Sequence, residues 1–90
     1  MKTVFIVSGY FWDAEKKEYD KFEISKHDRV EDALVVYDAL KPTENMNQVE
    51  VWEEELNRYG VAVTDKRIRL KDTSGEYDEP GLGGGWYEDL

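Results

Sequence analysis

The most apolar stretch of the chain, residues 3–12, limits the possible folds more than any other feature of the sequence. It reads TVFIVSGYFW, and large apolar side chains occur at both even and odd positions. A strand of this composition buries both of its faces, which is typical of a strand in the middle of a sheet. We therefore expect residues 2–12 to form a central strand against which the rest of the chain packs.

The composition indicates one small domain. Ninety residues with 40% apolar side chains are enough for a modest core. The absence of cysteine excludes disulfides and thiol chemistry. No apolar run reaches the roughly 20 residues of a membrane-spanning helix, and the N-terminal segment lacks the small-residue cleavage site of a secretory signal. We expect a cytoplasmic protein.

The net charge of −9 is unevenly distributed. Residues 72–90 contain six of the 21 acidic residues and no lysine or arginine, so they carry −6, and residues 1–71 carry −3. The same C-terminal segment is rich in glycine and ends in WYEDL. We expect one folded domain over residues 1–71, followed by an acidic, Gly-rich tail over residues 72–90. Such an anionic surface repels nucleic acid and membranes and attracts basic partners.

Two further segments have the alternation of β-strands. Residues 19–26 place Phe22 and Ile24 on one face and polar side chains on the other, so we expect them to form an antiparallel hairpin with the central strand. Residues 61–71 are also strand-like, but their apolar positions change parity. That change predicts a bulge or tight turn near residues 64–66, within one bent strand or between two short ones.

Two segments have apolar residues at helical spacing. In the first, residues 29–41, a capping box of Asp28 and Glu31 begins the helix. The second, residues 47–59, fits a helix better than a strand because its apolar side chains form a narrow stripe. A strand is the alternative for this segment. The expected fold is α+β, with an antiparallel sheet of three to four strands and two helices on one face, in the order ββααβ with room for an extra short strand.

No motif in the sequence specifies a chemistry. His27 is the single histidine and lies just before the expected helix cap, so we expect a surface or capping role for it. The serines lie outside any nucleophile-elbow context. The glycines of residues 81–85 are followed by only five residues, too few for a phosphate-binding helix. We expect a protein without catalytic activity, cofactor or metal.

Glu50, Glu53 and Glu54 would share one surface of the second helix, roughly 5 to 6 Å apart. This spacing is close to that of phosphates along a nucleic-acid strand, so the ridge is a candidate nucleic-acid mimic that occupies a basic site on a partner. A solvated face without a partner is the alternative. The end of the tail is a second candidate, either docking an aromatic side chain into a partner or folding back onto its own sheet. Its residues are Trp86, Tyr87, Glu88 and Asp89.

The basic segment KRIRLK supports a different hypothesis. On a regular strand Arg67, Arg69 and Lys71 share one face and can contact phosphates. Tyr10 and Trp12 would then stack on bases. The alternative for these bases is pairing with acids of the same protein. RNA or DNA binding by this strand is the second hypothesis.

In size, acidity and lack of catalytic groups, the chain resembles the small accessory inhibitors that bacteriophages and mobile elements direct against host nucleases or defence systems. The likeness is one of overall character and involves no specific motif. It implies a non-enzymatic, acidic protein that occupies a basic site on a partner in the host cytoplasm and inhibits or regulates it. Protein binding of this kind is the leading hypothesis.

Overall fold

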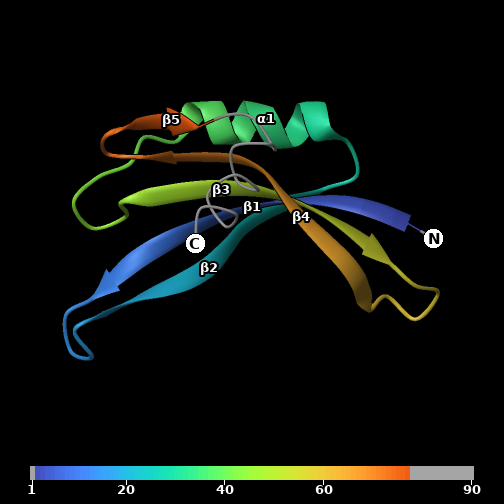
Figure 1. Cartoon of the computed structure of the whole chain (residues 1–90), viewed down its shortest axis with the longest axis horizontal. Coiled ribbons are helices and arrows are strands. Elements are labelled where there is room, and N and C mark those ends of the chain that lie inside the picture. The colour runs from blue at the N-terminus through green and yellow to red at the C-terminus, as the bar shows by residue number, and fades with distance from the viewer. Residues whose placement is uncertain (1, 78–90) are drawn as a thin grey trace, which may run out of the picture.

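The structure, a computed structural model that describes residues 2–77, has an α+β fold of five antiparallel strands and one helix. The elements are β1 (Lys2–Asp13), β2 (Glu18–His27), α1 (Val30–Ala39), β3 (Gln48–Leu56), β4 (Ala62–Asp72) and β5 (Gly75–Tyr77). The strand order in the sheet is β2-β1-β3-β4-β5. Figure 1 shows a twisted sheet with α1 lying across one face.

β1 lies between β2 and β3, so the predicted hairpin is confirmed and the apolar stretch occupies an interior position. Its two faces are buried differently. Val7 packs with Ala33 and Tyr37 of α1, whereas Val4 and Ile6 are buried on the opposite face. Pairing on both sides satisfies the backbone groups of a segment too apolar for an edge position.

The core lies between α1 and the sheet. Its fully buried members are Val7, Ala33, Tyr37, Val49 and Val51. Burying each valine side chain stabilises the fold by about 1.5 to 3 kcal/mol. The helix therefore holds the middle strands together by covering one face of each.

The helix predicted at residues 29–41 is confirmed as a helix, with a different start. Arg29 occupies the N-cap position and forms no capping hydrogen bond through its side chain. Asp28 instead pairs with Lys2 at 3.3 Å, so the predicted capping box is wrong. Within the described part of the chain α1 is the one helix, and it is too short and too polar to cross a bilayer.

The helix predicted at residues 47–59 is wrong, because most of this segment is β3. The strand puts Val49 and Val51 side by side in the core, where both are 0% exposed. It also pairs along both edges, with β1 and with β4. These long-range contacts outweigh the local helical spacing, so the chain has one helix in the order ββαβββ rather than two helices in ββααβ.

The expected irregularity of the fourth strand is present as two register shifts in β4. They lie at Val63 and at Ile68, on either side of the predicted residues 64–66. β5 pairs with β4 and carries the sheet past residue 71, where we expected the folded domain to end. The rest of the expected tail, residues 78–90, lies outside the described residues.

Candidate partner-binding site

The three glutamates of the predicted ridge do not share a surface. Side chains alternate along β3, so Glu50 and Glu54 project from the face away from α1, and Glu53 projects from the α1 side. Glu50 is only 1% exposed. The phosphate-like spacing expected from a helix is therefore absent.

Donors from three strands surround the Glu50 carboxylate. Gln48 Nε2 and Trp52 Nε1 each donate a hydrogen bond to it at 2.8 Å. Arg67 Nη1 lies 3.1 Å and Lys21 Nζ 3.6 Å from its oxygens. A buried carboxylate needs such partners because removing it from water costs several kcal/mol. The charge of Glu50 is thus balanced within the protein and is not presented to a partner.

The bases of β4 do not form the predicted single stripe. The bulge at Ile68 interrupts the alternation between Arg67 and Arg69, so Arg67 points away from α1 towards Glu50. Lys71 points to the other face, where its Nζ donates to the Tyr37 carbonyl oxygen at 2.5 Å and lies 4.3 Å from the ring centre. Arg69 Nη1 donates to the carbonyl oxygen of Ile68 at 2.8 Å. The prediction that these bases share a face is wrong.

The aromatic residues proposed to stack on bases lie on β1, on the face away from α1. Tyr10 is opposite Lys21 of β2. Trp12 packs against Tyr19, with ring centres 5.1 Å apart. The aromatic and acidic residues of the tail, Trp86, Tyr87, Glu88 and Asp89, lie outside the described residues.

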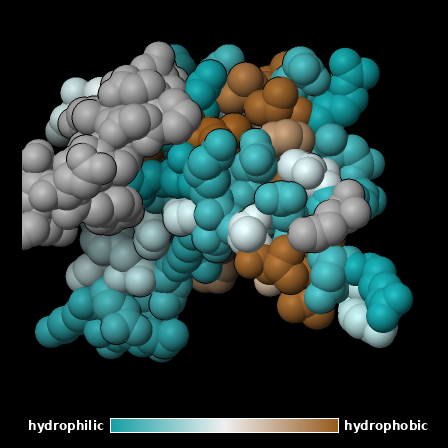
Figure 2. Space-filling model, turned by 45° about the vertical axis from the view of Figure 1, so that its right-hand side comes forward, coloured by the Kyte–Doolittle hydropathy of each residue, from teal (hydrophilic) through white to brown (hydrophobic). Residues whose placement is uncertain are grey.

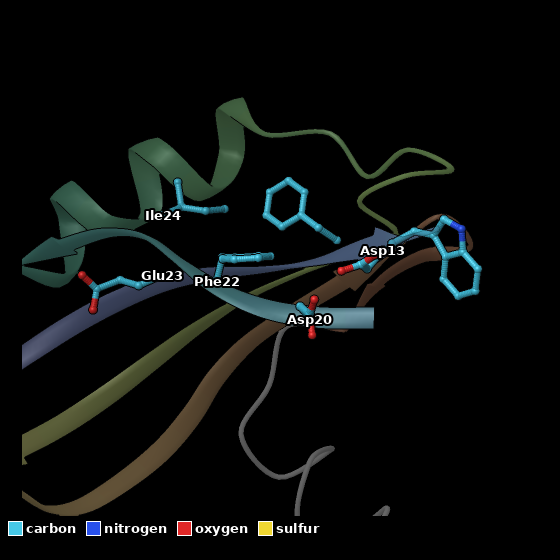
Figure 3. Close-up of a pocket in the computed structure, with 7 residues that line it drawn as sticks. Asp13, Asp20, Phe22, Glu23 and Ile24 are labelled. Carbon is cyan, nitrogen blue, oxygen red and sulfur yellow. The ribbon is translucent and has the colours of Figure 1, made fainter. Parts of the chain in front are cut away.

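A hollow of about 480 Å³ opens where the β1–β2 hairpin extends beyond the helix. Its apolar residues on the α1 side are Phe11, Phe22 and Ile24, and Trp12 borders it at the end of β1 with its ring on the other face, against Tyr19. The rings of Phe11 and Phe22 meet edge to face at 5.2 Å, and Phe22 is still 49% exposed. Figure 3 shows Phe22 and Ile24 on the side of β2 where α1 lies.

Carboxylates complete the lining of this hollow. On this side of the sheet they belong to Asp13 and Asp20. Glu23 also borders the hollow, but it lies opposite Ser8 and its side chain projects from the face away from α1. Asp20 pairs with Lys16 at 3.6 Å, through side chains that are both partly exposed. Such surface pairs are weak, at about 0 to 1 kcal/mol, so they yield readily to a competing charge. The hollow thus combines exposed aromatic surface with negative charge.

Sequence reasoning missed this site because it depends on relative lengths. The ten-residue α1 is about 15 Å long, whereas the twelve-residue β1 spans about 40 Å. The helix therefore leaves the hairpin end of the sheet uncovered. The sequence feature that could have indicated the hollow is the presence of large aromatic residues on both sides of the predicted hairpin turn.

A second, smaller hollow of about 280 Å³ lies on the face away from α1 and includes Trp52, Glu54 and Asp65. Lys21 Nζ already lies 4.3 Å from the centre of the Trp52 ring. The aromatic surface of this hollow is therefore covered by a cation of the protein itself.

Other exposed apolar side chains lie on α1 and in the β3–β4 hairpin. They are Val35, Tyr59, Val61 and Val63. Figure 2 shows the apolar surface on these parts as separate brown areas among hydrophilic side chains. The hollow near this hairpin is lined by Lys2 and Arg58 and by no acid. Aromatic surface and carboxylates occur together at the β1–β2 end.

The described residues form no recognisable catalytic group. His27 Nε2 and Ser25 Oγ are 2.8 Å apart, but within residues 2–77 no carboxylate hydrogen-bonds to the imidazole. A nucleophile activated by histidine normally needs such a third group to orient the base. Residues 2–77 also contain no group of three or more side chains placed to hold a metal ion.

Comparisons with known proteins give no assignment. No protein-family model, no curated protein and no solved structure matches the chain. Its function is therefore inferred from the arrangement of its own residues.

Proposed function

We propose that this chain is a non-enzymatic acidic protein that binds a basic site on a partner protein in the cytoplasm and thereby inhibits or regulates that partner. The hollow lined by aromatic and acidic side chains at the β1–β2 hairpin is the observation that carries the proposal. Protein interfaces are built in the same way, with a few aromatic anchors at the centre and charged groups around them.

The net charge of the whole chain supports the same kind of partner. At −9, its field speeds the approach of positively charged surfaces and opposes that of nucleic acids and membranes. The contributing carboxylates are not those first expected, because Glu50 is buried and paired. Asp13 and Asp20 at the hollow take their place in this proposal.

Nucleic-acid binding through β4 has less support from the structure. Arg67 contacts the buried Glu50, and Lys71 contacts Tyr37 on the opposite face of the sheet. Phosphate binding requires several bases on one surface. We therefore retain protein binding as the proposed function.

The proposal is tested by measuring affinity for a partner captured on the immobilised full-length protein and then purified. We expect the affinity to fall steeply between low and high salt. We also expect the double variant Asp13→Asn/Asp20→Asn, which neutralises the two carboxylates on the hollow's side of the sheet, to bind about tenfold more weakly, which is about 1.4 kcal/mol. Calorimetric titration measures both effects.

The matched control is Asp32→Asn/Asp38→Asn, which removes the same number of charges from the exposed surface of α1. We expect this variant to retain its affinity within about twofold, since its charges lie away from the hollow. Affinity that is independent of salt, or that falls equally in both double variants, would contradict the proposal.

A further inference from the structure

We propose that the hollow and the adjoining edge of β2 accept an extended segment of the partner, in which an apolar residue alternates with a lysine or arginine. The inference rests on the proposed function and specifies the chemistry of the segment that is bound. It follows from the position of β2, from the register of the hairpin and from the charge around the hollow.

β2 lies at the end of the sheet, and within residues 2–77 no strand lies on its outer side. The pairing of β1 with β2 has a register shift between Val7 and Ser8 of β1. From this shift to the hairpin turn the pairing is regular, and it covers residues 18–23 of β2. The outward backbone groups of such an edge can accept another strand. Six residues are enough for the length of an ordinary strand.

Edge strands are often protected by a lysine that projects over the edge. In this segment the lysine is Lys21, and it is directed inward. Its Nζ lies 3.6 Å from Glu50 Oε1 and 4.3 Å from the Trp52 ring centre. The edge is consequently left open beside the hollow.

The register of the hairpin determines which side chains an added strand would meet. Phe22 is opposite Gly9, and Asp20 is opposite Phe11, so Phe22 and Asp20 project from the α1 side of β2. An added strand places every second side chain on that side, about 7 Å apart. One of them would enter the hollow beside Phe22, and the next would lie beside the Asp20 carboxylate.

This arrangement favours an apolar side chain in the first position and a basic side chain in the second. A second copy of the chain is a poorer occupant, because each copy has a net charge of −9. The C-terminal segment is also a poor match by charge, since residues 78–90 contain acids and no base. Charge complementarity therefore points to a basic partner.

The experiment selects peptides from a random display library on the immobilised full-length protein and measures the affinity of the selected peptides in solution. We expect them to contain an apolar residue two positions from a lysine or arginine. Phe22→Ser should weaken their binding at least tenfold. Tyr59→Ser removes a similarly exposed aromatic ring from the β3–β4 hairpin and should leave the affinity unchanged.

Amide hydrogen exchange measured by NMR tests the addition of a strand. With a selected peptide bound, outward amides of residues 18–23 should exchange more slowly. Unchanged exchange in this segment, or selected peptides without the expected alternation, overturns the proposal. So does failure to select any peptide.

Two further measurements distinguish the other occupants. A dimer in sedimentation experiments that is dispersed by Phe22→Ser would assign the edge to a second copy and overturn the proposal. Peptide binding that strengthens strongly in Trp86→Ala would assign the hollow to the C-terminal segment, with the same consequence. A partner that responds to salt and to Asp13→Asn/Asp20→Asn but not to Phe22→Ser would preserve the proposed function and remove this inference alone.

Discussion

Arg67 Nη1 lies 3.1 Å from Glu50 Oε2, although the two residues are 17 positions apart in the chain. The contact depends on the bulge at Ile68, which turns Arg67 to the face where Glu50 is buried. A regular β4 that kept Leu70 opposite Glu50 would point Arg67 to the α1 side. The bulge therefore brings a positive charge to a carboxylate that would otherwise be buried with fewer partners.

Replacing Arg67 with methionine should reduce the free energy of unfolding by about 3 kcal/mol, because it leaves Glu50 buried without its closest cation. Urea unfolding followed by tryptophan fluorescence measures the loss. The control is Arg58→Met, which removes an exposed arginine from the β3–β4 hairpin and should change the stability by less than about 0.5 kcal/mol. Similar losses in both variants would show that the buried pair has no special role.

Gly9 lies beneath a close group of side chains that includes Phe11 and Ile24, two residues lining the hollow. A Cβ atom at this position would lie 3.0 Å from Met46 Sδ and 3.1 Å from Ile24 Cδ1. Gly9→Ala should therefore lower the free energy of unfolding by about 1 kcal/mol through crowding. In a double-mutant cycle, Met46→Ala should reduce the effect of Gly9→Ala.

Gly60 provides the matched control for this cycle. It has no neighbouring atom within 4 Å of an added Cβ, but its φ of +81° disfavours alanine. Gly60→Ala should thus lower the free energy of unfolding through backbone strain alone. In the double variant with Met46→Ala, the two losses of free energy should simply sum. If Met46→Ala changes the effects of Gly9→Ala and Gly60→Ala to the same extent, crowding against Met46 is not the cause of the destabilisation by Gly9→Ala.

Local patterns were sufficient to predict the first hairpin and the helix, because alternation and helical spacing are properties of a single segment. They were insufficient for β3, whose helical stripe is locally favourable and whose pairing with β1 and β4 decides the outcome. A change of parity indicated an irregular β4, but the positions of the bulges at Val63 and Ile68 depend on the partner strand. The hollow depends on a register that puts Phe22 opposite Gly9, which no single segment encodes.

Val51 is the apolar residue that a helix over residues 47–59 leaves out of its stripe, and in β3 it is 0% exposed. Val51→Ala should therefore cost about 2 kcal/mol in the free energy of unfolding, through lost burial and the cavity left behind. Val63→Ala, at a position 48% exposed in β4, should cost no more than about 0.5 kcal/mol. Urea unfolding of both variants is the measurement. A neutral Val51→Ala would favour the helical interpretation.

Glu31 provides a test at the start of α1. Its own backbone amide, followed by the Arg29 side chain at 3.3 Å, lowers the pKa of the Glu31 carboxyl below its ordinary value of 4.5. Because the folded-state pKa is lowered, ionised Glu31 stabilises the fold above the unfolded-state pKa, and this contribution is lost as the pH falls through the folded-state pKa. The effect on stability is small because the side chain is exposed.

An NMR titration of Glu31 should give a midpoint below 4.5. In Arg29→Ala the midpoint should rise yet stay below 4.5, since the backbone hydrogen bond remains. A midpoint that does not move in Arg29→Ala would exclude a contribution from the guanidinium.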